Sequence, residues 1–210
     1  MNRFRRESTQ YLCTLYSRES IQEFFQVPRP KSLSLCGRSN VGKSTLINAL
    51  FRNKIARASK TPGKTREVQV FTTQIDNVDE KFLIFDLPGY GHARVSKMER
   101  KRWDELMASF FEFLPKDNLI LHILDAKNPL QKNDRDFKAY ITQYDFLYWV
   151  IFNKTDKLKN QKEKNLFKEQ KLEITADQIF NLSALKKRNT FLLEEDLINF
   201  LYQPEESVPE

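Results

Sequence analysis

The stretch SLSLCGRSNVGKSTLINAL, residues 32–50, contains a strand pattern, a loop with two glycines and the start of a helix pattern. The loop GRSNVGKS fits G-x-x-x-x-G-K-[ST], in which backbone N–H groups turn inward around an anion and the helix N-terminus adds positive potential. Lys43 supplies a point charge for phosphate groups, and the Ser44 hydroxyl is placed to ligate Mg²⁺. An ordinary glycine turn is the alternative, which the flanking strand and helix patterns disfavour. The stretch therefore predicts a phosphate-binding loop after a buried strand.

Short apolar runs alternate with amphipathic helical patterns along the chain, which is typical of an α/β fold with a mostly parallel sheet. The predicted strands cover 32–36, 68–76, 81–86, 118–125, 146–152 and 178–183. The predicted helices cover 43–52, about 97–113, 133–143, 159–170 and 190–202. We expect a six-stranded sheet with helices on both faces. The expected organisation is an N-terminal extension over 1–30 that packs on the domain, one compact domain over 31–203 and a disordered acidic tail over 204–210.

The composition indicates one soluble domain with a basic surface. Hydrophobic residues make up 40% of the 210 residues, which can fill one sizeable core. The 35 Lys and Arg against 28 Asp and Glu give a net charge of +7, which permits, without requiring, a polyanionic partner such as RNA. Of the two cysteines, Cys13 and Cys36, the second lies in the apolar run SLSLC, which favours a buried thiol over a disulfide or a metal ligand. The N-terminal residues include no uninterrupted apolar segment of membrane-spanning length. We therefore expect a reduced, cytoplasmic protein without a membrane segment.

Two further stretches supply groups that a bound Mg²⁺ and its nucleotide would need. In FLIFDLPG, Asp86 ends an apolar strand and can reach the ion through water, while Gly89 can bring a backbone N–H to a γ-phosphate. In the loop SKTPGKTRE, the hydroxyls of Thr61 and Thr65 compete as the metal ligand, and the residues alone leave that choice open. Such a loop suits an order–disorder switch that closes on the γ-phosphate, with a solvated polar loop as the alternative.

The tetrapeptide NKTD, residues 153–156, follows another apolar strand and can select the base. A carboxylate at Asp156 can accept from both N1–H and the 2-amino group of guanine, whereas adenine lacks that amino group and has an acceptor at N1. Asn153 can brace the loop and meet the base edge, and the stem of Lys154 can lie along the base. An isolated NKTD would more often cap a helix, but its place after DLPG favours a guanine site. The backbone of LSA, residues 182–184, can approach the guanine carbonyl.

These motifs, in this order, resemble a translation-factor-class GTPase of the Ras-like P-loop fold. The wording GRSNVGKSTLIN, ARASKTPGKTRE, DLPGYGHARVSKMERKRW and ILDAKNPLQKND is similar to the EngB family, also called YihA or YsxC, within the TrmE-Era-EngA-EngB-septin-like superfamily. That family consists of bacterial single-domain GTPases linked to assembly of the large ribosomal subunit and to cell division and septation. Lys127 and Asn128 stand where many members have Arg-His, and the first thirty residues match poorly.

The resemblance implies that the chain binds GTP and GDP with Mg²⁺. It implies Lys43, Thr65 and Gly89 as catalytic residues, and Ser44 and Thr65 as metal ligands with Asp86 acting through water, so that Thr65 is preferred to Thr61. The implied nucleotide contacts are Gly37, Arg38, Ser39, Asn40, Val41, Gly42, Lys43, Ser44, Gly63, Lys64, Thr65, Arg66, Glu67, Asp86, Leu87, Pro88, Gly89, Asn153, Lys154, Thr155, Asp156, Leu182, Ser183 and Ala184.

Two positions bear on the rate of hydrolysis. Ras-like enzymes carry a glutamine directly after D-x-x-G that orients the attacking water, and this chain has Tyr90 there. A phenol cannot readily do this, so we expect slow intrinsic hydrolysis; the alternative interpretation is that Tyr90 packs against the sheet. Asn40 matches the position that helps to hold K⁺ in related potassium-stimulated GTPases, which makes a K⁺ near Asn40 a hypothesis.

The segment after Tyr90 turns strongly basic, and a capping box of Ser96 and Glu99 predicts that a helix starts there. A run of this kind is usually a solvated helix face. Beside a γ-phosphate sensor it could also be a docking face for ribosomal RNA. Its residues are Arg94, Lys97, Arg100, Lys101 and Arg102, and the loop residues Lys54, Arg57, Lys60, Lys64 and Arg66 could extend it.

The favoured function is a monomeric, GTP-dependent switch that docks on the large ribosomal subunit precursor through rRNA and ribosomal proteins. One alternative is a switch that acts on another RNA or protein. A second is a P-loop kinase or nucleotide hydrolase, which the guanine-selecting NKTD disfavours. A third is a filament- or membrane-associated GTPase of the septin type, for which the chain shows no coiled-coil or amphipathic-anchor pattern.

Overall fold

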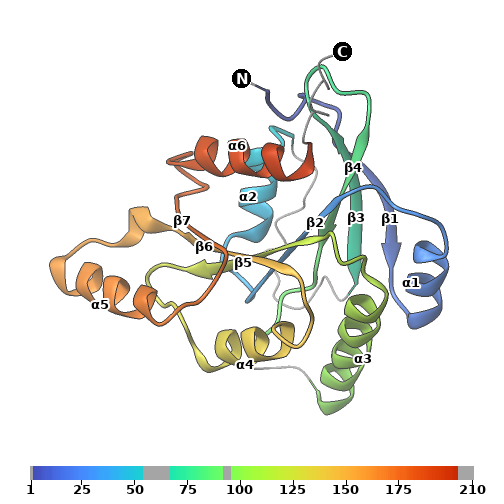
Figure 1. Ribbon diagram of the computed structural model, residues 1–210. Helices are drawn as coiled ribbons and strands as arrows, with labels where there is room; N and C mark the ends of the chain where they lie inside the picture. Colours follow the sequence, from blue (N-terminus) through green and yellow to red (C-terminus); the bar gives the residue numbers. More distant parts are fainter. Residues whose placement is uncertain (1, 54–66, 92–95, 203–210) are drawn as a thin grey trace.

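One mixed sheet forms the centre of the computed structural model, which describes residues 2–53, 67–91 and 96–202 (Figure 1). Its strands lie in the order β1-β3-β4-β2-β5-β6-β7. Their bounds are β1 Gln10–Leu15, β2 Ser32–Gly37, β3 Val68–Gln74, β4 Lys81–Asp86, β5 Leu119–Asp125, β6 Leu147–Asn153 and β7 Gln178–Asn181. The helices are α1 Arg18–Phe25, α2 Lys43–Leu50, α3 Lys97–Phe113, α4 Lys132–Ile141, α5 Gln161–Leu172 and α6 Thr190–Leu201, with a 3-10 turn at Thr155–Lys157.

Strand direction brings the loops of interest to one edge of this sheet. The strands β4, β2, β5, β6 and β7 pair in parallel, while β3 pairs antiparallel with both β4 and β1. The central strands are almost wholly apolar, as expected for strands that helices cover on both faces. Because parallel strands end at the same edge, the loops after β2, β4, β5, β6 and β7 lie together.

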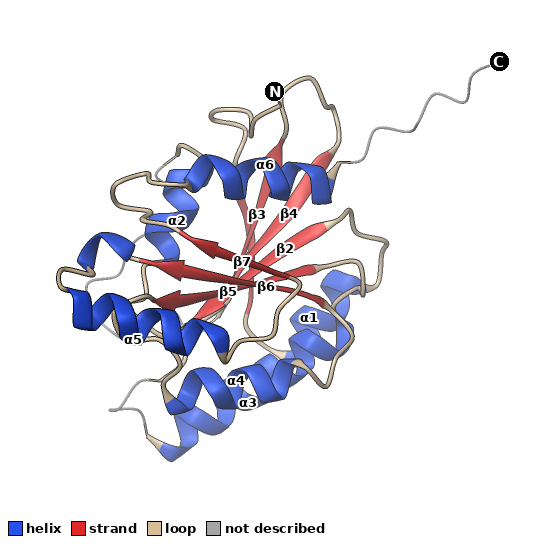
Figure 2. Ribbon diagram, turned by 60° about the vertical axis from the view of Figure 1, so that its left-hand side comes forward, coloured by secondary structure: helices blue, strands red, loops and turns tan. Residues whose placement is uncertain are grey.

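The helices divide into two layers, one on each face of the sheet (Figure 2). Helices α2 and α6 cover one face, where Leu46 and Leu197 pack in a cluster with Leu35 of β2. Helices α1, α3, α4 and α5 cover the other, where Phe110 of α3 lies 5.2 Å from Phe85 of β4 between ring centroids. Helix α3 begins with the predicted capping box, since Glu99 N donates to Ser96 Oγ and Ser96 N donates to Glu99 Oε2.

The structure confirms the α/β fold with a mostly parallel sheet and places each predicted strand and helix within a few residues. The prediction of six strands is wrong, because β1 adds a seventh at the edge of the sheet. The pattern of β1 is obscured by a register shift between Tyr11 and Cys13, which interrupts the two-residue alternation. Its edge position also leaves Tyr11 and Leu12 exposed. Helix α1 was not predicted either, although Ser17 and Ser20 form a capping box there.

Residues before β1 also pack against this domain. Phe4 is buried, with its ring centroid 4.7 Å from that of Phe51, and its N–H donates to Glu194 of α6 at 3.1 Å. The hydroxyls of Thr9 and Thr73 share a buried hydrogen bond of 2.9 Å. The first residues of the chain therefore close one end of the core.

Candidate nucleotide-binding site

The loop after β2 has the backbone of an anion site. It runs from Gly37, the last residue of β2, to Lys43, the first residue of α2. Gly42 precedes the helix at a φ of +96°, and a Cβ there would collide with the side-chain amide of Asn153. A residue with a side chain is therefore excluded by both conformation and space. Gly42 also has no side chain that could accept from the first amides of α2, which leaves them to a ligand or to solvent.

The register of β2 with β4 places a buried carboxylate beside this loop. Leu35 is paired with Asp86, whose side chain is almost completely buried and forms an ion pair with Lys43 Nζ. Ser44 follows in the first turn of α2. The cation and the carboxylate meet here, and the hydroxyl residue Ser44 is next to Lys43 in the chain. This set of groups fits a phosphate group with Mg²⁺, an ion that takes few protein ligands and keeps several waters. No cluster of three or more His, Cys, Asp or Glu suited to a metal occurs among the described residues, and this kind of site does not need one.

Asn153, at the end of β6, joins two of the loops. Its Nδ2 donates to Val41 O of the phosphate loop at 3.0 Å, and its Oδ1 accepts from Ala184 N at 2.9 Å and from Lys154 N at 2.8 Å. The side chain is buried, and these bonds use both acceptor positions of Oδ1 and one of the two N–H donors of Nδ2. Asn153 therefore braces the loop, and the contact with the base edge stays a prediction for which its second N–H remains.

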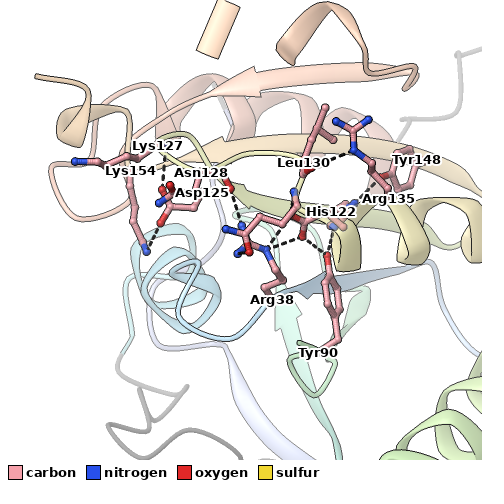
Figure 3. Close-up of polar contacts among 12 residues, drawn as sticks. Arg38, Tyr90, His122, Asp125, Lys127, Asn128, Leu130, Arg135, Tyr148 and Lys154 are labelled. Atoms are coloured by element: carbon pink, nitrogen blue, oxygen red, sulfur yellow. Dashed lines mark hydrogen bonds and ion pairs between the residues drawn. The ribbon is translucent and has the colours of Figure 1, made fainter. Parts of the chain in front are cut away.

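The next residue, Lys154, links the same loops by charge. It has a φ of +64°, and its Nζ contacts both Asn40 O and the carboxylate of Asp125, the latter at 2.7 Å. Asp125 lies opposite Asn153 in the register of β5 with β6. The stem of Lys154 thus crosses between the NKTD loop and the phosphate loop (Figure 3).

The remaining two residues of NKTD are held by the loop after β7. Thr155 donates to Leu182 O through its N–H at 3.2 Å and its hydroxyl at 3.0 Å. The Asp156 carboxylate accepts from Ser183 Oγ at 2.5 Å, which leaves its second oxygen and its remaining lone pairs for other donors. The hydroxyl of Ser183 therefore orients the carboxylate that the sequence predicts to select the base.

The structure brings together four of the five predicted groups of site residues, at 37–44, 86–89, 153–156 and 182–184. Glu67 is exposed just before β3. Gly63, Lys64, Thr65, Arg66 and the rival Thr61 lie outside the described residues, as do Arg94 and the basic residues predicted in the loop 54–66.

The side chains of Arg38, a predicted nucleotide contact, and of Tyr90, which stands in place of glutamine, both contact α4 (Figure 3). Arg38 directs its guanidinium toward α4, where Nε donates to Asp134 at 2.8 and 2.9 Å. Tyr90 is buried, stacks on Phe137 of α4 with centroids 5.0 Å apart, and donates to Asp134 at 2.8 Å. The interpretation that Tyr90 packs inside the domain is therefore confirmed, and its hydroxyl is not free to orient water.

Sequence reasoning missed Asp134 and His122, which complete this cluster. His122 lies within the apolar strand LILHILD and is buried between the hydroxyls of Tyr90 and Tyr148. A polar residue within a fully buried strand was the signal for it. Burial, reinforced by the charges of Arg38 and Lys138, lowers the pKa of His122 to about 3.

Burial has the opposite effect on the two acidic groups of the cluster. It raises the pKa of the Asp134 carboxyl, an effect that Arg38 opposes. It also raises the pKa of the Tyr90 phenol, and the nearby Asp134 carboxylate adds to this. Tyr90 and His122 are therefore both neutral near pH 7.

The parallel sheet, the phosphate loop after β2, Asp86 after β4 and the NKTD loop after β6 define a P-loop GTPase domain of the Ras-like type. A family model described as 50S ribosome-binding GTPase matches residues 32–154, which is more than half of the chain. Two relatives called "Probable GTP-binding protein EngB" come from Kosmotoga olearia, with 40% identity over 66% of this chain and 70% of the relative, and from Prosthecochloris aestuarii, with 35% identity over 78% and 84%. The chain belongs to the EngB family of GTP-binding proteins.

Solved structures agree with this assignment. A crystal structure of a probable GTP-binding protein EngB is 26% identical, with a TM-score of 0.60 over 81% of this chain and 98% of that one. Era in complex with MgGDPNP and nucleotides of 16S ribosomal RNA has a TM-score of 0.66 at 23% identity, over 87% of this chain and 60% of that one, and is similar in fold. In the part of the chain that the structure describes, no helix has the length and apolar character needed to span a membrane.

The burial of neutral His122 predicts how stability changes with pH. The pKa is about 3 in the folded protein and about 6.5 in the unfolded chain, so the unfolded state gains a proton first as the pH falls. The contribution of His122 to stability is complete above pH 6.5 and is lost progressively between about pH 6.5 and 3. Lowering the pH from 7 to 5.5 should therefore cost wild type about 1 kcal/mol more than it costs His122→Gln, measured by urea unfolding. Equal losses in the two proteins would contradict the assigned state of His122.

Proposed function

We propose that this chain is a GTP-dependent switch in assembly of the large ribosomal subunit, with slow hydrolysis of GTP to GDP promoting its release. The observation that carries the proposal is the position of the basic first turns of α3 directly after the loop that carries Asp86 and Gly89. Trp103 of α3 ties the two together, because its Nε1–H donates to Pro88 O at 3.4 Å. Movement of this loop toward a γ-phosphate would therefore pull on α3.

The nucleotide roles that we propose follow from the contacts of each group. Lys43 would exchange Asp86 for the β- and γ-phosphates, and the amide of Gly89 would meet the γ-phosphate. Mg²⁺, held by Ser44, Thr65 and, through water, Asp86, would supply the positive charge that neutralises phosphate oxygens. The residues proposed to contact nucleotide remain 37–44, 63–67, 86–89, 153–156 and 182–184, with Asp156 selecting guanine and with Arg38 contributing its backbone.

Slow turnover follows from the burial of Tyr90. Its hydroxyl is committed to Asp134, so the side chain that replaces glutamine after D-x-x-G is directed into the domain, toward α4. The chain then lacks, at this position, a group that orients the attacking water. Lys43, the proposed Mg²⁺ site and Gly89 would stabilise charge, and a bound partner would supply the missing positioning.

The partner surface that we propose is the N-terminal half of α3. Lys97, Arg100, Lys101 and Arg102 are exposed there, and Lys101 makes only a loose pair of 3.7 Å with Glu105. Phosphates of ribosomal RNA would fit such a surface, and binding through them would weaken with salt.

We place this activity in the cytoplasm of a bacterial cell and expect a monomer. The family link to cell division would then be an indirect effect of ribosome supply. A switch that acts on another RNA or protein is the alternative.

Sedimentation with purified ribosomal subunits tests the switch. We expect the protein to pellet with large-subunit particles with a non-hydrolysable GTP analogue, to do so less with GDP, and to bind more weakly at the higher of two salt concentrations. Arg100→Glu combined with Lys101→Glu should reduce pelleting strongly, whereas Lys162→Glu combined with Lys164→Glu on exposed α5 is the matched control. Binding that ignores the nucleotide would contradict the proposal.

Base selection is tested by Asp156→Asn. An amide has one acceptor oxygen where a carboxylate has two, so binding of GTP and GDP should each weaken by about 100-fold. Xanthine nucleotides, which carry an oxygen at the 2-position, should bind better. Titration calorimetry with GDP, XDP and ADP measures this, and Asp145→Asn on the surface is the control. Unchanged affinity for GDP would refute the role of Asp156.

The K⁺ hypothesis is tested by turnover in K⁺ and Na⁺ buffers at equal ionic strength. Asn40 is exposed at the edge of the phosphate loop with a φ of +66°, and its backbone carbonyl oxygen contacts a cation, Lys154 Nζ. We expect faster hydrolysis in K⁺ and loss of this stimulation in Asn40→Ala. Equal rates of hydrolysis in the two buffers would contradict a K⁺ site near Asn40.

A further inference from the structure

A single buried carboxylate outside every nucleotide-binding motif joins two loops of the site. Asp134 lies in the first turn of α4 and is completely buried. Its oxygens accept from Arg38 Nε at 2.8 and 2.9 Å, from Tyr90 Oη at 2.8 Å and from Gln131 N at 3.0 Å. A buried charge is costly unless it is paired and hydrogen-bonded, and these donors satisfy that requirement.

The two long-range partners of Asp134 belong to the two loops that would bracket the γ-phosphate. Arg38 is the second residue of the phosphate loop, and Tyr90 directly follows DLPG. The main chains of the loops are also joined, because Ser39 N donates to Tyr90 O at 3.1 Å. They approach so closely that a Cβ on Gly89 would lie 2.9 Å from Ser39 Oγ. The position of Gly89 therefore depends on where Tyr90 and Arg38 are held.

Arg38 contributes to this arrangement with its whole guanidinium group. Besides the Asp134 contacts, Nη1 donates to Gln131 Oε1 at 2.6 Å and Nη2 donates to Asn128 O at 2.7 Å (Figure 3). Each of its three nitrogens is thus bonded to the segment 128–134. The side chain is committed to the β5–α4 connection, which leaves the backbone of Arg38 as the part that lines the phosphate loop.

The hydrogen bonds of the cluster all donate in one direction, toward Asp134. Tyr90 donates its only hydroxyl hydrogen to Asp134, so its contact with His122 Nε2 requires that Nε2 carries the hydrogen. A neutral His122 then accepts at Nδ1 from the hydroxyl of Tyr148 at 2.5 Å. The chain of donors runs from β6 through β5 to Tyr90 and ends on Asp134. Tyr148, His122 and Tyr90 each donate one hydrogen, which fixes the rotamer of Tyr90 more narrowly than apolar packing would.

We propose that Asp134 is a positioning residue of the nucleotide site, which holds the Gly89–Tyr90 segment against the phosphate loop through Arg38 and Tyr90. It sets the place of the Gly89 amide, so it acts on the γ-phosphate and much less on the GDP part of the ligand. This role rests on the proposed function, because it presumes that the nucleotide lies in this site.

The test compares affinities for GDP and for a non-hydrolysable GTP analogue. Tyr90→Phe removes only the hydroxyl, and Asp134→Asn removes the charge with little change in size. We expect each variant to bind GDP within about threefold of wild type, while binding of the GTP analogue and the rate of hydrolysis each fall by about tenfold or more. The double variant should lose no more than the worse single one, since both act through one contact.

Matched controls separate positioning from general destabilisation. Tyr140→Phe removes a hydroxyl of α4 that bonds the Tyr144 hydroxyl at 3.0 Å, and Asp136→Asn removes an exposed carboxylate paired with Lys132. Both should leave the ratio of GDP to GTP-analogue affinity unchanged. In ¹⁵N NMR, His122 should be in the Nε2–H form in wild type, and its signals should shift in Tyr90→Phe.

Two results would overturn this role of Asp134 while leaving the proposed function intact. One is that Tyr90→Phe and Asp134→Asn keep the wild-type preference between the two nucleotides. The other is that they weaken both nucleotides equally, in step with a lower melting temperature. A wild-type protein that binds no guanine nucleotide would instead overturn the proposed function, and this role with it.

Discussion

The site depends on the central position of β2, which pairs in parallel with β4 on one side and β5 on the other. Its register with β4 sets Leu35 beside Asp86, so the buried carboxylate that ends β4 faces the first residue of α2, Lys43. Its register with β5 sets Cys36 beside His122. A one-residue slip would turn these side chains to the opposite face. Apolar packing on both faces of the sheet stabilises this register. Helices α2 and α6 cover one face, and α1, α3, α4 and α5 cover the other.

The loops at the edge of the sheet are bound to one another by a few polar side chains that have little freedom. Asn153 uses its amide to join the phosphate loop to the loop after β7, and Lys154 joins the phosphate loop to Asp125. Asp134 does the same for the phosphate loop and the segment after Asp86. A nucleotide that occupied this edge would touch loops already connected in pairs, so binding at the guanine end and at the phosphate end would be energetically coupled.

The sequence predicted the parts of this site that are local in the chain. GRSNVGKS and NKTD carry their chemistry within eight and four consecutive residues, and the flanking strands and helices are strongly patterned. The edge strand β1 was missed because its register shift hides the alternation. Helix α1 was missed because no neighbouring motif marks it, whereas the phosphate loop marks the equally short α2. The Asp134 cluster was missed for a different reason. Its contacts join residues 96 and 44 positions apart, and no local pattern specifies which buried groups will meet.

The central claim is that a guanine nucleotide binds along the edge formed by the ends of β2, β4, β6 and β7. Hydrogen–deuterium exchange with mass spectrometry tests it most directly, because it reports the protection of each loop in one experiment. With GDP, amide exchange should slow together in residues 37–44, 153–156 and 182–184. A non-hydrolysable GTP analogue should add protection at 86–91, and ADP should protect none of these segments. Protection by ADP equal to that by GDP, or protection confined to the phosphate loop, would contradict the account.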